Sequence, residues 1–359
     1  MSFPATAPQP LLGKNANGTP FYSKQEATAP DPMTNVAVEF SVIVAAYNSA
    51  QTIGACLTAL QNQTMDASRY EIIVIDDGST DGTSEITQKT NVTVVRQENR
   101  GQAAARNAGI RLAKGDIICC TDADCIPAPN WLEELTRPLL EDPRISGGKG
   151  VYKTAQTGLT ARFVQMEYED KYDRLRHFPR ITFVDTYSAV YRKTAVIDVG
   201  CFDERFPVAE DRELSYRLAA AGYEMVFVET AVVSHTHADT VPSYFHKKIL
   251  NGYWAGQAIS HFPERSREDS YTPQTMKLQV GLIALFLASA FFAIFSPVSR
   301  IVSAIMAAIF TLTTLPFIHK NWRKDKAVAL AAPFYLALRA LALGIGFTGR
   351  ILRKIEKQK

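Results

Sequence analysis

The sequence has almost no surplus of charge of either sign. Its 39 lysines and arginines nearly cancel its 36 aspartates and glutamates, which leaves a net charge of +3 over 359 residues. A protein that binds nucleic acid through the phosphate backbone normally carries a clear excess of basic residues. We therefore expect no nucleic-acid partner.

Cysteines are few, and their spacing excludes the usual zinc motifs. Two of the five cysteines, Cys119 and Cys120, are adjacent, which suits neither a zinc site nor a redox pair. The sequence also lacks a secretory signal, in which a basic stretch precedes an apolar one. We expect the water-soluble part of the chain to stay in the cytosol.

Residues 1–35 lack any sustained apolar period. They are rich in alanine, proline, threonine and asparagine. Such a composition buries too little apolar surface to offset the loss of chain entropy on folding. It predicts a flexible N-terminal tail.

Apolar runs begin after this tail and alternate with helical patterns. Four of the runs have the composition of strands buried on both faces: Phe40–Ala46, Glu71–Ile75, Val92–Val95 and Ile117–Cys120. Strands that alternate with helices form βαβ units. The sequence thus predicts an α/β domain over residues 38–265, with a right-handed, doubly wound parallel sheet.

Two carboxylates, Asp122 and Asp124, follow the run Ile117–Cys120 at the end of its predicted strand. Ligands bind at the carboxyl ends of strands in open α/β sheets, and carboxylates are ligands that Mg²⁺ and Mn²⁺ prefer. The pattern is therefore a candidate seat for a metal-bound diphosphate. A plain Asp-rich turn is the alternative.

More charged residues follow the neighbouring predicted strands. Asp76 ends a strand that we expect to lie beside the one ending at Asp122, where its carboxylate could bind a nucleotide base; turn formation is the alternative. Arg100 and Arg106 follow the third strand. They are either countercharges for a nucleotide or part of a solvated helix face.

Glu210 and Asp211 begin a helical pattern that ends at Gly222. Such a pair either caps the helix, where its dipole favours negative charge, or supplies a general base. His235 follows a predicted strand and could reach the metal, and His237 is the next candidate on the same side of the chain. A hydrogen-bonded packing histidine is the alternative for both.

The motifs occur in an order that resembles the family 2 glycosyltransferases. They read SVIVAAYN, EIIVIDDGSTDGT, ENRGQAAARNAGI, GDIICCTDADCIPAPNWLEEL, FDERFPVAEDRELSYRLAAAGY and VVSHTH, between about residues 40 and 240. The resemblance implies the GT-A fold and an inverting transfer from a nucleotide-sugar that depends on Mn²⁺ or Mg²⁺. Carried over residue by residue, the resemblance implies that the nucleotide is bound by Ala46, Tyr47, Asn48 and Asp76, with Arg100 and Arg106 as countercharges. It implies Asp122 for the ribose and the metal, and Asp124 and His235, less favourably His237, for the metal. The implied base is Asp211, with Glu210 as the competing carboxylate.

One departure from the family bears on the product. The processive synthases of cellulose and hyaluronan carry a Gln-x-x-Arg-Trp motif after the base, whereas residues 250–257 here read LNGYWAGQ. This difference predicts single transfer to a lipid-linked or envelope glycan acceptor. The alternative is a catalytically idle membrane partner of a glycan-synthesis enzyme, and the intact pairs Asp122/Asp124 and Glu210/Asp211 favour activity.

Residues 276–359 have the composition of a membrane domain. Segments 278–295 and 301–318 are uncharged, and at about 1.5 Å per residue each is roughly 27 Å long, close to the hydrocarbon core of a bilayer. A third segment, 327–348, carries Arg339 and is either membrane-associated or spanning. The basic loop 319–326 predicts a cytoplasmic catalytic domain on the cell inner membrane.

Overall fold

A computed structural model describes residues 11–14, 20–22, 38–262, 264, 270 and 272–356. The chain divides into two compact units, Met1–Val36 and Ala37–Lys359. In the first unit, strands β1 (Leu11–Lys14) and β2 (Pro20–Tyr22) pair antiparallel. The other residues of the predicted tail lie outside the described residues.

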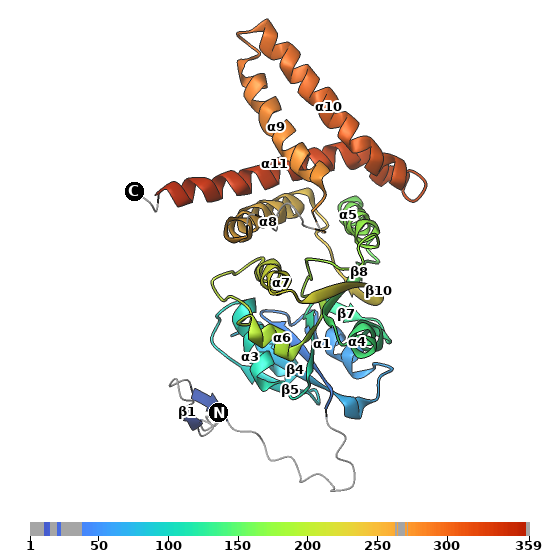
Figure 1. The fold of residues 1–359 in the computed structure, drawn as a ribbon, viewed down its shortest axis with the longest axis vertical. Helices are drawn as coiled ribbons and strands as arrows, with labels where there is room; N and C mark the ends of the chain where they lie inside the picture. Colours follow the sequence, from blue (N-terminus) through green and yellow to red (C-terminus); the bar gives the residue numbers. More distant parts are fainter. Residues whose placement is uncertain are drawn as a thin grey trace, which may run out of the picture. The chain divides into compact units, whose positions relative to one another are not determined.

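The second unit is built around an eight-stranded sheet (Figure 1) with the strand order β5-β4-β3-β6-β9-β8-β10-β7. The first four strands in this order run parallel, as the alternation of strands and helices predicts. These strands are β3 (Phe40–Ala46), β4 (Tyr70–Asp76), β5 (Thr93–Arg96) and β6 (Ile117–Asp122).

The other half of the sheet is mixed, which corrects the prediction of a fully parallel sheet. Strand β9 (Ser188–Arg192) is antiparallel to both β6 and β8 (Ile145–Lys153). Strand β10 (Glu224–His235) is parallel to β8, and the short β7 (Cys125–Pro127) is antiparallel to β10. The helix between β8 and β9 contributes Phe163 and Val164 to a core away from the sheet, and the chain then re-enters the sheet in the opposite direction.

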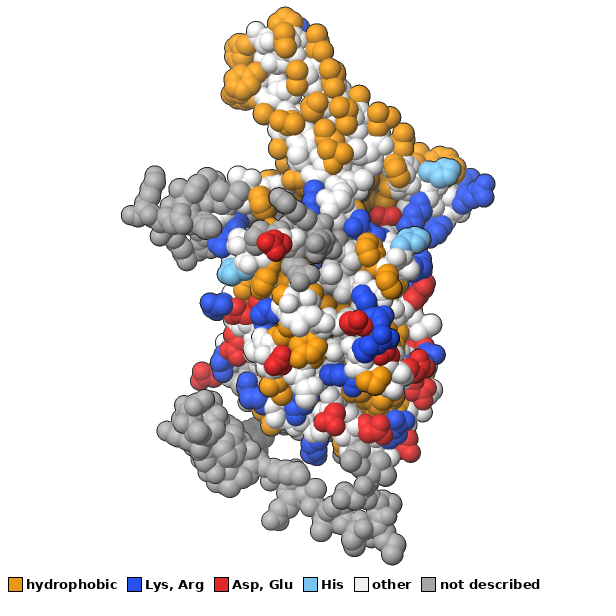
Figure 2. All heavy atoms as spheres, viewed as in Figure 1, with side chains coloured by type: hydrophobic (Ala, Val, Ile, Leu, Met, Phe, Trp, Pro, Cys, Tyr) orange, Lys and Arg blue, Asp and Glu red, His pale blue; other side chains and the backbone are white. Residues whose placement is uncertain are grey.

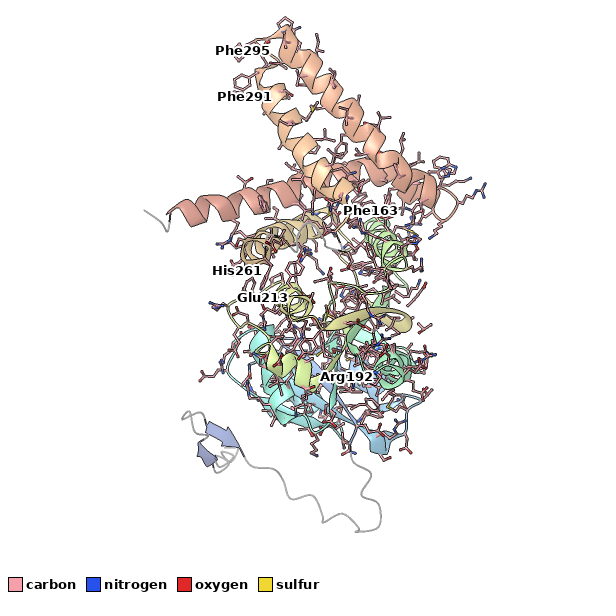
Figure 3. All side chains as sticks on the ribbon, in the orientation of Figure 1. Phe163, Arg192, Glu213, His261, Phe291 and Phe295 are labelled. Atoms are coloured by element: carbon pink, nitrogen blue, oxygen red, sulfur yellow. The ribbon has the colours of Figure 1, made fainter. Side chains whose placement is uncertain are left out.

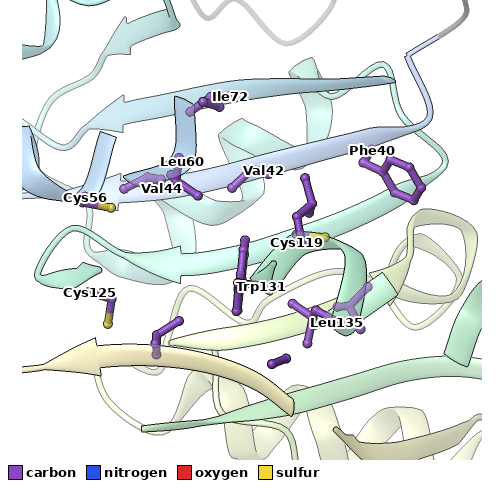
Figure 4. Packing of buried hydrophobic residues seen from close by; sticks show 14 of the residues in the cluster. Phe40, Val42, Val44, Cys56, Leu60, Ile72, Cys119, Cys125, Trp131 and Leu135 are labelled. Atoms are coloured by element: carbon purple, nitrogen blue, oxygen red, sulfur yellow. The ribbon is translucent and has the colours of Figure 1, made fainter. Parts of the chain in front are cut away.

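Helices cover both faces of the sheet, which explains why its parallel strands are apolar throughout. Along β3, Phe40, Val42 and Val44 belong to one core and Ile43 to the other. Trp131 lies fully buried in the first core, beside these strands (Figure 4). The helices of this region are α1 (Ile53–Gln61), α2 (Thr83–Thr87), α3 (Gln102–Leu112), α4 (Trp131–Glu141), α5 (Leu159–Leu175), α6 (Lys193–Asp198) and α7 (Glu210–Ala220).

Within the described residues, three helices are long and apolar enough to cross a membrane. They are α9 (Gln274–Phe292), α10 (Pro297–Asn321) and α11 (Lys326–Glu356). The segments that we predicted at 278–295, 301–318 and 327–348 fall largely on these helices. Apolar side chains cover the surface of α9 and α10 (Figure 2), and Phe291 and Phe295 are 71% and 80% exposed near their junction (Figure 3). An exposed apolar surface of this kind suits contact with lipid.

These helices share a core with the α/β domain. Phe163 of α5, Tyr244 of α8 (Val241–His261) and Tyr335 of α11 belong to one buried cluster, to which α9 and α10 also contribute. The rings of Phe163 and Tyr335 stack with centroids 4.5 Å apart. The predicted boundary between the domains 38–265 and 276–359 is thus a boundary in composition, and packing continues across it.

Glycines allow α8 and α11 to approach closely. A Cβ atom added to Gly346 of α11 would lie 2.1 Å from the carbonyl oxygen of Ile249, and one added to Gly252 of α8 would lie 2.5 Å from that of Leu343. Backbone atoms cannot move aside as a flexible side chain can. Small residues at helix crossings serve this purpose in membrane proteins.

We expect Gly346→Ala to destabilise the protein by about 1–3 kcal/mol, the usual cost of overpacking a close contact. Gly349→Ala is the matched control on the same helix, because a Cβ there would meet nothing within 4 Å. Alanine is favoured over glycine in a helix, so the control should be neutral or slightly stabilising. Thermal unfolding in detergent would compare the two, and equal midpoints would contradict the close crossing.

Candidate functional site

The loops after β3 and β4 form the first part of the site. Asn48 adopts a left-handed conformation (φ 49°), and its side-chain oxygen accepts the backbone N–H of Thr80 at 2.9 Å. Its own N–H donates to the hydroxyl of Ser79 at 2.9 Å. These two hydrogen bonds join the loops. Tyr47, a predicted nucleotide contact, is half exposed, whereas Ala46 beside it is buried.

Asp76 is buried at the end of β4. One of its oxygens accepts the backbone N–H of Ser79 at 2.9 Å, and the other accepts the hydroxyl of Ser84. The next residue, Asp77, accepts the backbone N–H of Arg100 at 2.9 Å. Both carboxylates therefore hold the surrounding loops together. A contact between Asp76 and a nucleotide base stays a prediction.

Asp122 ends β6, and Asp124 follows in the turn into β7. Strand β3 lies between β4 and β6, so the strands that end at Asp76 and Asp122 are not neighbours, which corrects our expectation. The side chains of Asp122 and Asp124 are 31% and 50% exposed. His235, at the end of β10, places its Nε2 atom 3.3 Å from Oδ2 of Asp124.

The tautomer of His235 follows from its hydrogen-bond partners. Gln165 donates its Nε2 to the carbonyl of Tyr152 at 3.1 Å, so its Oε1 must accept from Nε2 of His237 at 3.0 Å. Burial, aided by nearby cationic side chains, lowers the pKa of His237 to about 3, so this ring is neutral. Its Nδ1 then accepts a hydrogen bond from the Nδ1–H group of His235, 3.0 Å away.

In a neutral His235 the Nε2 atom is then a lone-pair acceptor that faces the carboxylate of Asp124. Two acceptors at 3.3 Å repel each other unless a metal cation or a proton lies between them. Ligand atoms of Asp122 and Asp124 lie within 4.8 Å of one another, together with the thiol of Cys125. Carboxylate oxygens and a neutral imidazole suit Mn²⁺ or Mg²⁺. The donor set therefore fits the expected divalent cation.

Arg106 links the two halves of the site. It is 1% exposed, its Nη2 lies 2.8 Å from Oδ1 of Asp122, and its Nη1 binds Glu210. Its guanidinium thus contacts protein carboxylates. These contacts let Arg106 position Asp122 and Glu210, and its expected role as a countercharge for the nucleotide stays a prediction.

Asp211 follows Glu210 at the start of α7. The preceding Ala209 has a left-handed backbone (φ 67°), a conformation that costs energy for a residue other than glycine and is common at functional sites. Burial raises the pKa of Asp211, and the nearby charges of Glu210 and Asp185 raise it further. A carboxylate with a raised pKa is better suited to accept a proton near neutral pH.

Arg100 lies at the surface of the site. Its Nη2 lies 2.7 Å from Oε2 of Glu204, with its side chain 52% exposed. It therefore remains accessible, and its predicted contact with a nucleotide stays a prediction.

The hydrogen bonds around His237 make a prediction about metal affinity. Gln165→Leu removes the acceptor that fixes the His237 tautomer, so it should weaken Mn²⁺ binding about 10- to 100-fold, as loss of a group behind a metal ligand usually does. Paramagnetic resonance titration with Mn²⁺ measures this affinity directly. Gln63→Leu is the control, because Gln63 also joins backbone groups, but its partners are Ala128 and Leu132 and not a histidine. Equal affinities in the two variants would refute the assignment.

Sequence reasoning missed the residues that support the site. Gln165, Asp185 and the positioning role of Arg106 carry no local motif. Only Arg106 could have been recognised, as a charged residue within the alanine-rich helix after β5. A charged side chain in such a helix is buried only if it is paired with an opposite charge. The others come from distant elements that the fold brings together.

The chain is similar to known proteins in both sequence and fold. The model of Glycosyl transferase family 2 matches residues 41–200. A mannosyltransferase of Pyrobaculum calidifontis, solved in complex with GDP-Man and Mn²⁺, has a similar fold, with a TM-score of 0.59, 22% identity and coverage of 92% of this chain and 91% of that one. At this identity the likeness establishes the GT-A fold alone.

Two relatives extend the comparison. Glycosyltransferase AglE of Haloferax volcanii is 30% identical over 214 residues, which are 56% of this chain and 68% of the relative. A poly-beta-1,6-N-acetyl-D-glucosamine synthase of Staphylococcus aureus is 29% identical over 257 residues, 65% of this chain and 61% of that protein. The chain thus spans about two thirds of the length of these relatives. From the matched domain, the identity to AglE and the fold, the chain belongs to glycosyl transferase family 2.

Proposed function

We propose that the protein transfers a sugar from a nucleoside diphosphate donor to a lipid-linked or envelope glycan acceptor, with inversion and one sugar at a time. The observation that carries this proposal is the connection of Asp122 and Glu210 through the buried Arg106. This connection holds a cation-binding carboxylate and the neighbour of Asp211 in one rigid arrangement. Such an arrangement provides a donor site and a base together.

The residues divide the reaction between them. The oxygen of an acceptor hydroxyl attacks the anomeric carbon, and Asp211 accepts the proton that this oxygen loses. The bond to the nucleoside diphosphate breaks on the opposite face, so the configuration inverts. A divalent cation, when bound, neutralises charge on the departing diphosphate. Asp122, Asp124 and Nε2 of His235 would hold it there.

The same chemistry limits the acceptor. With Asp211 as a single base there is no covalent intermediate, so the acceptor must lie on the face of the sugar opposite the diphosphate. Within the described residues, the region after the base has no Gln-x-x-Arg-Trp motif. This absence supports single transfer, although a relative is a polysaccharide synthase by name.

The membrane arrangement follows from charge and packing. The basic loop after α10 supports a cytoplasmic catalytic domain. Arg339, in the middle of α11, lies 3.0 Å from Glu167 of the catalytic domain and donates to Gln279 of α9 at 2.7 Å. A charge held by the catalytic domain cannot also lie at the centre of the bilayer, so we place α11 along the membrane surface and α9 and α10 across it.

The test is a panel of nucleotide-sugars, including GDP-mannose and UDP-N-acetylglucosamine. The purified full-length protein should release nucleotide from one of them in the presence of Mn²⁺ or Mg²⁺, and chelation should stop the release. If no donor binds and none is hydrolysed, the protein is an idle partner of another enzyme.

A further inference from the structure

Buried charges gather where α5, α8 and α11 meet. Glu167 of α5 is 3% exposed and binds cations from the other two helices. Its Oε2 lies 3.0 Å from Nζ of Lys248, and its Oε1 lies 3.0 Å from Nη1 of Arg339. The hydroxyl of Tyr244 donates to the same carboxylate at 3.2 Å. One carboxylate thus serves two cationic side chains.

The lysines near Glu167 are held in an unfavourable environment for their charge. Burial, and then the charge of Lys248, lower the pKa of Lys171 to about 7. Burial also lowers the pKa of Lys248, despite the opposing pull of Glu167. An anion that binds beside such a lysine stabilises its charged form.

Lys248, together with the neighbouring Lys247, borders a cavity. It is lined by Tyr168 of α5, by His237, and by Tyr244, Lys247, Lys248 and Asn251 of α8. Lys247 is exposed, whereas the side chain of Lys248 is mostly buried. Two ammonium groups, an amide and the phenol of Tyr168 can donate hydrogen bonds, whereas the hydroxyl of Tyr244 already donates to Glu167. Such a wall matches the several acceptor oxygens of a phosphate.

The position of the cavity indicates which phosphate it would take. On one side, His237 is hydrogen bonded to His235, which faces Asp124 of the donor site. On the other side, Glu167 and Arg339 connect the cavity to α11, which is apolar enough to enter a membrane. An anion in the cavity would therefore lie between the donor site and the apolar helix α11.

We propose that this cavity binds the phosphate head of an acceptor lipid, whose apolar chain follows the surface of α8 and α11. The inference rests on the proposed transferase function and names its acceptor class. Lys247, Lys248 and Asn251 contact the phosphate oxygens. Glu167 holds Lys248 and Arg339 in place and competes with the phosphate for them.

The experiment uses the full chain in phosphatidylcholine nanodiscs, with hexadecyl phosphate as the probe and without donor. Lys247→Gln and Lys248→Gln should each weaken binding of the probe about tenfold, as expected for a hydrogen bond to a charged group. Lys324→Gln, which removes an exposed lysine bound to Glu169, is the control and should bind normally. Glu167→Gln should bind the probe more tightly, because glutamine keeps the shape of the side chain but carries no negative charge that competes with the phosphate for the cations.

Several outcomes would overturn the inference. Equal binding by all variants would show that the cavity does not hold the probe, and Lys247→Gln keeps this test available if Lys248→Gln does not fold. Equal competition by inorganic phosphate or phosphatidylglycerol would exclude a specific acceptor. Displacement of the probe by nucleoside diphosphate with Mn²⁺ would assign the cavity to the donor. Metal-dependent nucleotide release by the same preparation reports separately on the proposed function.

Discussion

Replacing Asp211 with asparagine should lower sugar transfer by about 10²- to 10⁴-fold, the usual contribution of a general base, while donor binding stays intact. A base accepts its proton only in the transition state. Its loss should therefore lower kcat and kcat/KM together, with little change in nucleotide affinity. Transfer rate and nucleotide affinity, measured on the same preparation, separate these effects.

The neighbouring carboxylate provides the discriminating comparison. Glu210 binds Arg106, so its oxygens are directed into the protein. Glu210→Gln should mainly destabilise the link to Asp122 and thereby weaken donor binding. Asp203→Asn is a surface control on the loop before α7, where Asp203 pairs with the exposed Arg205. An inactive Glu210→Gln beside a normally active Asp211→Asn would show that the wrong carboxylate was assigned.

The pH profile gives a second readout of the same base. Asp211 must be ionised to accept a proton, and burial with two nearby negative charges raises its pKa. The value of kcat/KM should therefore fall as pH decreases through a range above that of an ordinary carboxyl group. A limb at the ordinary value, near pH 4, would indicate a solvent-exposed base.

Replacing Asp124 with asparagine should abolish the metal-dependent part of nucleoside diphosphate binding. The side chain stays isosteric, but it loses the negative charge that faces Nε2 of His235 and that a divalent cation requires. Asparagine can still hydrogen bond to this imidazole, so the fold should survive. Calorimetric titration of the diphosphate with and without Mn²⁺ measures the difference.

The controls for this prediction come from the structure. Asp81→Asn changes a carboxylate on the rim that caps α2 through Thr83 and should keep metal-dependent binding. His235→Gln should weaken Mn²⁺ binding less than Asp124→Asn, because it removes a neutral ligand. Unchanged metal-dependent affinity in Asp124→Asn would refute the assignment of this carboxylate to the metal.

The parallel half of the fold was predictable because local pattern and burial coincide there. The strands ending at Ala46, Asp76 and Asp122 are apolar on both faces, which local sequence alone reveals. The reversal at β9 was not predictable, since no local signal shows that α5 would pack with α8 and α11 instead of returning the chain in parallel.

The sequence by itself determined which residue types are available: two carboxylates at the end of β6, a carboxylate pair at the start of α7, and helices with membrane-like composition. These features depend only on the order of residues along the chain and on their hydrophobicity, so each can be recognised from a short stretch of sequence. Tertiary structure alone decided that Arg106 joins Asp122 to Glu210, that Gln165 fixes the proton on His235, and that Arg339 docks on Glu167. Each of these contacts joins residues from elements that are far apart in the sequence. Such ion pairs and hydrogen bonds form only once folding brings the elements together.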